Sequence, residues 1–208
     1  GFTALQGQAN TLVENGKLIE AIPLLKELVK RVEVSDNSEI KLDFPIFLIG
    51  TGHIQQYIAS KQTSELSEAL RWYDRLEKEF PNSPKIKDML LKRIDVLRAL
   101  SKNNEAIDLM KKILSGGYRN VRLSQSEQTK LLKDLTQIYY STGQLSAGLP
   151  YFGQLFEIAR SPEDQALAAA ASFEALFQAE RLDDALNLLP RLAKESAVRY
   201  RPRLNVAL

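Results

Sequence analysis

The chain has 208 residues, of which 44% are hydrophobic and 26% are charged, and its formal net charge is only +2. This mixture is typical of a folded soluble protein and argues against a disordered tail. The near balance of charge provides no general attraction to nucleic acid. The absence of cysteine excludes disulfides, thiolate nucleophiles and zinc-thiolate sites. No apolar run approaches the roughly 20 residues that a membrane-spanning helix needs, so we expect no membrane insertion.

The composition leaves the compartment open between the cytoplasm and the periplasm. The first ten residues lack the basic and then apolar plan of a signal peptide. Because the chain starts at Gly1 and not at Met, an export signal removed before this point stays an alternative.

A sequence pattern recurs five times at a period of about forty residues. In each copy a small residue follows a polar stretch and is itself followed by apolar residues one, four and seven places on, as in Leu70, Tyr73 and Leu76. This spacing predicts an amphipathic helix that faces a core. The five small residues are Ala21, Ala69, Ala106, Gly148 and Ala185.

Another helical stretch and a short turn precede these helices, so each copy is predicted to be a helical hairpin. Gly16 and Gly143 occupy the same place in their turns, where glycine can adopt the positive φ that ends a helix. The apolar stretch at 44–50 begins the first helix of the second hairpin, with Pro45 in its first turn. We predict one repeat domain over residues 1–208, with units at about 2–34, 44–82, 84–116, 124–161 and 163–198, and with a further helix starting in 199–208.

The hairpins resemble the tetratricopeptide (TPR) repeat family. The second unit carries the resemblance best, with Ala69, Tyr73 four places later and Pro81 closing the helix. The third unit departs from the family by having Ser101 at the turn glycine, and the fourth has Gly148 where alanine is usual. The helix ending around Pro81 also resembles that of bacterial envelope repeat proteins. The resemblance implies an all-α, right-handed superhelix, or solenoid, of about five antiparallel helix pairs.

Catalytic or metal chemistry finds little support in the residues. His53 is the only histidine, and we interpret it as an ordinary packed or surface residue, because one histidine cannot form a metal site alone. Gly50 and Gly52 lack the βαβ context and the lysine of a phosphate loop, so close helix crossing explains them better. Asp183 and Asp184 lie at a helix start, where they cap the helix. We therefore expect no enzyme activity and no cofactor.

In stacked hairpins of this kind the first helices line a concave face, where a partner would bind. Taking Ala9, Ile54, Ile94, Thr136 and Phe173 as the packed residues predicts which neighbours point outwards. The exposed, protein-binding set is predicted to be Gln6, Asn10, Thr51, Gln55, Asp95, Arg98, Lys133, Gln137, Tyr140, Glu174 and Phe177. This mixture of amides, charges and aromatic residues suits a bound peptide or helix.

The sequence thus predicts a non-catalytic scaffold that binds a protein or peptide ligand and does not bind nucleic acid. The alternative is a structural spacer, or a repeat segment of a larger multidomain or envelope-assembly protein. Self-association through the terminal repeats is a further option, because a terminal repeat without a polar cap can stack on a second copy.

Overall fold

The computed structural model describes residues 2–35 and 40–188 of the chain. Within these residues there are ten α-helices and no β-strand. In chain order the helices are α1 (Phe2–Glu14), α2 (Leu18–Ser35), α3 (Asp43–Ser60), α4 (Thr63–Glu79), α5 (Ile86–Ala99), α6 (Asn103–Leu114), α7 (Gln125–Ser141), α8 (Leu145–Ile158), α9 (Pro162–Gln178) and α10 (Leu182–Leu186). No helix in the described part of the chain has the length and apolar character needed to cross a membrane.

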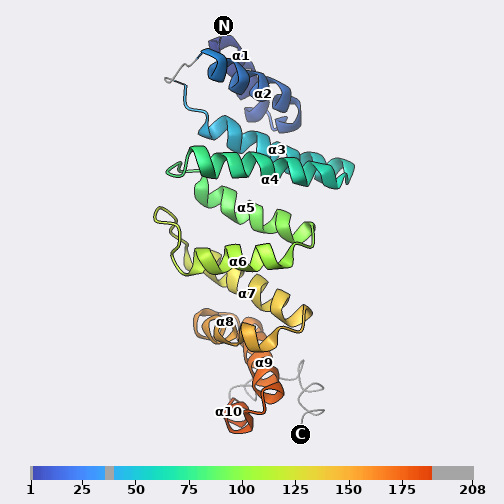
Figure 1. Cartoon of the computed structure of the whole chain (residues 1–208), viewed down its shortest axis with the longest axis vertical. Helices are drawn as coiled ribbons and strands as arrows, with labels where there is room; N and C mark the ends of the chain where they lie inside the picture. Colours follow the sequence, from blue (N-terminus) through green and yellow to red (C-terminus); the bar gives the residue numbers. More distant parts are fainter. Residues whose placement is uncertain (1, 36–39, 189–208) are drawn as a thin grey trace. The chain divides into compact units, whose positions relative to one another are not determined.

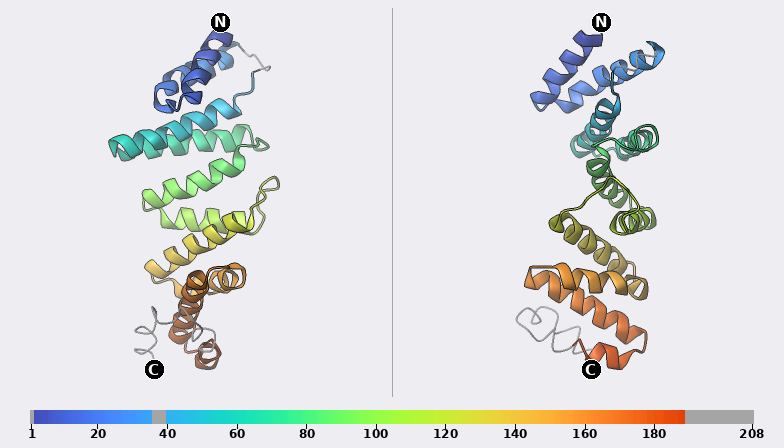
Figure 2. Two further views of the ribbon diagram at one scale, coloured as in Figure 1. Left: turned by 180° about the vertical axis from the view of Figure 1, so that it is seen from behind. Right: turned by 90° about the vertical axis from the view of Figure 1, so that its left-hand side faces the viewer.

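The helices form antiparallel pairs (Figure 1). The pairs belong to two compact units. The first unit ends at Val121 and holds the pairs α1/α2, α3/α4 and α5/α6. The second unit begins at Arg122 and holds α7/α8 and α9/α10. Figure 2 shows the three hairpins of the first unit stacked in chain order. The prediction of an all-α chain of about five helix pairs is confirmed.

Each of the five turns inside a hairpin contains a residue with positive φ, although only two of these residues are glycines. Gly16 and Gly143 have φ of 73° and 70°, as predicted, and Ser101 and Glu180 both have φ of 57°. In these four turns the left-handed residue donates its N–H three residues back and the next residue donates five residues back, which is the Schellman ending of a helix. Lys61, with φ of 60°, closes the α3/α4 turn with a single bond to the Tyr57 carbonyl.

The recurring small residues lie where the paired helices cross. Ala21, Ala69 and Ala106 are fully buried, and Ala185 is exposed by only 1%. Gly148, the exception to alanine, is buried as well. A Cβ atom there would lie 2.3 Å from Cζ of Phe152 and 2.9 Å from Cβ of Tyr139, so the aromatic ring occupies the place of the usual methyl group.

The second hairpin differs from the others because both of its helices are longer by about one turn at the connecting end. The stretch before Ala69 continues α4 back to Thr63, and α3 runs on to Ser60. Consequently Ile54 is only partly buried, whereas the sequence predicted it as the packed residue; Gly50 and His53 are buried in its place. The other four residues used to set the register, namely Ala9, Ile94, Thr136 and Phe173, are buried as predicted.

The start of α3 agrees with the sequence, because Pro45 is its third residue and is buried there. The predicted fifth unit is described only as far as Leu188. Residues 189–198 of that unit and the predicted further helix in 199–208 lie outside the described residues.

Candidate functional site

In the second unit the first helices α7 and α9 present the predicted binding residues on one shared face. The residues Lys133, Gln137 and Tyr140 follow one another at helical spacing on α7, and Glu174 and Phe177 do the same on α9. Two bonds join the helices on this face. The Tyr140 hydroxyl donates to Oε2 of Glu174 at 2.6 Å, and Nζ of Lys133 lies 2.6 Å from Oδ1 of Asp164.

These two bonds mean that several predicted ligand contacts already have partners within the chain. Tyr140, Lys133 and Glu174 are partly buried, whereas Gln137 is exposed. Phe177 is 39% exposed, and its ring stacks on that of the buried Phe173, with centroids 6.2 Å apart. The accessible part of the α7/α9 face is therefore an amide and an aromatic ring beside a paired tyrosine and carboxylate.

A pocket of about 540 Å³ lies at the end of this face where α7 and α9 begin. Ser161 caps α9 by accepting a hydrogen bond from the Asp164 amide at 3.1 Å, and Pro162 follows in the first turn. Arg160 donates to the Gln125 side chain, and both residues line the pocket. The lining residues are Gln125, Ser126, Thr129, Lys130, Lys133, Asp134, Arg160, Ser161 and Asp164. Three cations and two carboxylates make this pocket polar and of mixed charge.

In the first unit the predicted residues lie on α1, α3 and α5. Gln6, Asn10, Gln55 and Asp95 are exposed, and Arg98 is partly buried. Thr51 is also partly buried, and its hydroxyl lies 3.2 Å from that of Tyr73 inside the α3/α4 hairpin. Burial raises the pKa of the fully buried Tyr73, partly offset by the bond to Thr51. Thr51 thus takes part in the packing of its own hairpin.

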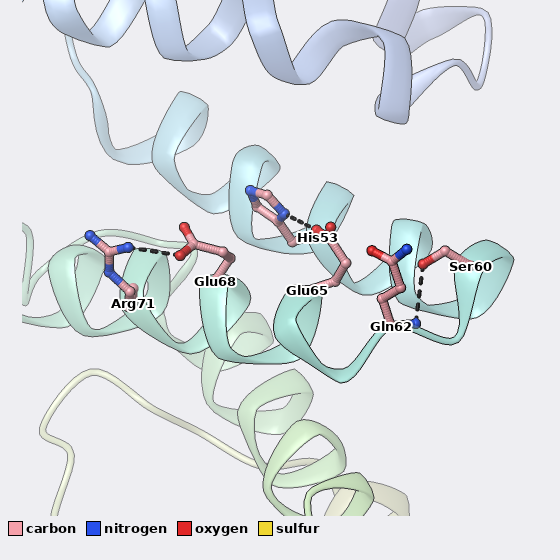
Figure 3. A network of polar contacts seen from close by, with 6 residues as sticks. All are labelled: His53, Ser60, Gln62, Glu65, Glu68 and Arg71. Atoms are coloured by element: carbon pink, nitrogen blue, oxygen red, sulfur yellow. Dashed lines mark hydrogen bonds and ion pairs between the residues drawn. The ribbon is translucent and has the colours of Figure 1, made fainter.

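The single histidine is buried in the same hairpin. Figure 3 shows His53 of α3 pointing to Glu65 of α4, with 2.6 Å between Nδ1 and Oε2. His53 is 5% exposed, and its Nε2 has no hydrogen-bond partner. In the residues that the structure describes, no group of three histidine or acidic side chains could hold a metal ion. The pair therefore joins two helices and has none of the further groups that a metal site would need.

Sequence reasoning missed the partners on the neighbouring helices. Asp164 follows a proline at a helix start, so its position in the sequence indicates capping and not an ion pair with Lys133. Arg93 was not singled out either, although it lies among Leu90, Ile94 and Leu97 in α5 and is 8% exposed. A charged residue on an otherwise apolar helix face is the signal that could have found it, because buried charges need partners.

No protein-family model matches the chain, and no curated protein matches it. Solved structures do match. A kinesin light chain of Podosopora anserina with nearly identical TPR-like repeats is 16% identical, with a TM-score of 0.53 over 91% of this chain and 92% of the other. MamA from Desulfovibrio magneticus RS-1, from residue 41 to its end, is 13% identical, with a TM-score of 0.54 over 92% of each chain. BtubC from P. vanneervenii is 15% identical, with a TM-score of 0.52 over 97% of this chain and 80% of the other.

These similarities show the fold of the chain, which is that of TPR-like repeat proteins. The predicted resemblance is thereby confirmed at the level of the fold.

Proposed function

We propose that the chain is a non-catalytic scaffold that holds a peptide or a helix of a partner protein against its first helices. The observation that carries the proposal is the α7/α9 face, where the exposed ring of Phe177 and the exposed amide of Gln137 flank the Tyr140–Glu174 pair. An exposed aromatic ring can anchor an apolar side chain, and amides can bond to the backbone of an extended peptide. The proposal extends to Gln6, Asn10, Gln55, Asp95 and Arg98 on the first helices of the first unit.

Because some of the predicted binding residues bond to other residues of the chain, they are not equally suited to a test of partner binding by substitution. Replacing Tyr140 or Lys133 would break a bond between α7 and α9, so a loss of binding could reflect a change in packing. Phe177 and Gln137 are exposed, and their replacement breaks neither of these two bonds. Gln154 is a matched control, because it is exposed on α8, the second helix of the same hairpin as α7.

The experiment is affinity capture from a lysate of the source organism, followed by mass spectrometry. The baits are the wild-type chain, the Phe177→Ser and Gln137→Ala double variant, and the Gln154→Ala control. We expect partner proteins that bind the wild type and the control but are lost with the double variant. Partners that bind all three baits equally would show that binding takes place elsewhere and would contradict the proposed face.

A structural spacer within a larger assembly is the second candidate. The spacer is favoured because the side chains of Lys133, Tyr140 and Glu174 bond to other residues of the chain, so fewer side chains of the α7/α9 face are available to bind a ligand. A spacer predicts that no partner depends on Phe177 and Gln137. Self-association through terminal repeats stays a prediction, and Leu182 and Leu186, each about half exposed on α10, are the described residues that bear on it.

A further inference from the structure

The first unit has a second candidate binding surface, lined by residues of α4, α5 and α6 and by none of the predicted binding residues. A groove of about 420 Å³ lies there. Its apolar wall consists of Leu70 from α4, Leu97 from α5, Leu100 directly after the end of α5, and Leu109 from α6. Leu97 and Leu109 are buried, while Leu70 and Leu100 are partly exposed. We call this surface the leucine groove.

A buried arginine also lines the leucine groove. Arg93 is 8% exposed, and its guanidinium donates from Nη1 to Glu77 and from Nη2 to Asp74, both on α4. Glu77 has a second partner, because the Tyr118 hydroxyl donates to its other carboxylate oxygen at 3.0 Å. The cation thus lines the groove while both of its outer nitrogens are paired with carboxylates of α4.

The two carboxylates that pair with Arg93 differ in their surroundings. The Glu77 side chain is 30% exposed and does not line the groove, whereas the Asp74 side chain is 72% exposed and does. An ion pair with so exposed a partner contributes little to stability, because water competes for the carboxylate. Nη2 of Arg93 is therefore a donor whose present partner a ligand carboxylate could replace, while Nη1 stays paired with Glu77.

The rim of the groove carries further charges. Arg71 and Lys102 both line it and are exposed. Arg71 pairs with Glu68 of α4, and Lys102, which directly precedes α6, pairs with Glu105, which lines the groove as well. Such exposed pairs are weak, so these cations are accessible to an incoming anion. The leucine groove thus combines an aliphatic wall with the cations of Arg71, Arg93 and Lys102 and the carboxylates of Asp74 and Glu105.

We infer that the leucine groove binds a peptide segment of a partner protein in which an aliphatic side chain lies next to a carboxylate. The aliphatic side chain packs against Leu70 and Leu100, and the carboxylate accepts a hydrogen bond from Nη2 of Arg93 in place of Asp74. An aliphatic anchor beside a charge-assisted hydrogen bond is a common combination for peptide recognition. This surface is separate from the α7/α9 face, and the inference does not depend on the function proposed for that face.

A selection from a random heptapeptide library displayed on phage tests the predicted peptide class. The full chain is the target, and a Leu70→Asp variant, whose helical content is checked by circular dichroism, serves for counter-selection. We expect the wild type to enrich peptides with Leu, Ile or Val next to Asp or Glu. Enrichment of any other class, no enrichment at all, or equal enrichment on the Leu70→Asp variant would overturn the inference.

A titration then tests the role of Arg93 without touching the buried residue itself. An enriched peptide and its version with the acid replaced by the amide are titrated against the wild type, Asp74→Asn and Asp88→Asn. Asp88 is a matched control, because it is an exposed aspartate in the first turn of α5 that does not line the groove. Asp74→Asn removes the carboxylate that competes for Nη2, so it should strengthen binding of the acidic peptide about two- to fivefold.

The amide peptide should bind more weakly than the acidic one and should gain nothing from Asp74→Asn. Asp88→Asn should bind both peptides as the wild type does, and so should the Phe177→Ser and Gln137→Ala double variant. Unchanged or weaker binding of the acidic peptide by Asp74→Asn would show that its carboxylate does not reach Arg93 and would overturn the inference. Loss of binding with the double variant would place the peptide on the α7/α9 face and overturn it equally.

Discussion

Gly148 and Gly153 lie in the interior of the same helix, α8, but they differ in the space around them. A Cβ atom on Gly148 would lie 2.3 Å and 2.6 Å from two ring carbons of Phe152 and 2.9 Å from Cβ of Tyr139. A Cβ atom on Gly153 would have no neighbour within 4 Å. The pair therefore separates the effect of packing from the general preference of helices for alanine.

Replacing glycine by alanine inside a helix stabilises it by up to about 1 kcal/mol. At Gly153 nothing opposes this gain, so Gly153→Ala should raise the free energy of unfolding of the second unit by up to about 1 kcal/mol. At Gly148 the methyl group must displace the ring of Phe152, which is fully buried, and such overpacking costs about 1 to 3 kcal/mol. Gly148→Ala should therefore be less stable than Gly153→Ala by about 1 to 3 kcal/mol.

Urea unfolding followed by circular dichroism measures the two free energies. Trp72, the only tryptophan, lies in α4, so its fluorescence follows the first unit separately. Phe152→Leu provides a further check, because the smaller side chain should make room, and Gly148→Ala should then destabilise less in that background. If Gly148→Ala is as stable as Gly153→Ala, the reasoning from the close contact is wrong.

Three further predictions concern local bonds and the backbone. Ser101→Gly should stabilise the α5/α6 turn by about 1 kcal/mol in thermal unfolding, because serine has a positive φ there; an unchanged midpoint would contradict this. Ser124→Ala removes the side chain that caps α7 and should cost about 1 kcal/mol of unfolding free energy in urea, with Ser126→Ala as the uncapped control. Burial raises the pKa of Tyr73 above its ordinary value of about 10, so the folded chain favours the neutral phenol. The neutral side chain therefore contributes its full stability below pH 10, and this stability is lost as the pH rises above 10. Up to about 1.4 kcal/mol should be lost per pH unit above 10, so the wild type should lose more stability than Tyr73→Phe between pH 9 and 11, and parallel pH profiles would refute the assignment.

The sequence by itself determined the helices, their pairing and most of the packing register. Helical periodicity and helix endings depend on residues close together in the chain, which is why the crossings at Ala21 and Ala106 and the glycine turns at Gly16 and Gly143 could be predicted. The same reasoning failed at Ile54, because the long stretch before Ala69 does not show by itself whether its extra residues extend the turn or the two helices, and here α3 and α4 each extend by about one turn and displace the crossing.

Only the tertiary structure decided which side chains meet across helices. The pairs of Lys133 with Asp164 and of Tyr140 with Glu174 join residues more than 30 positions apart, as the bonds of Thr51 with Tyr73 and of Arg93 with Asp74 join residues about 20 apart. Such contacts depend on how each helix is rotated against its neighbour, and the side chains at the crossings and the lengths of the turns set that rotation together. Residues predicted to face a ligand were therefore found paired within the chain, and the leucine groove could not be seen from the spacing of residues along any one helix.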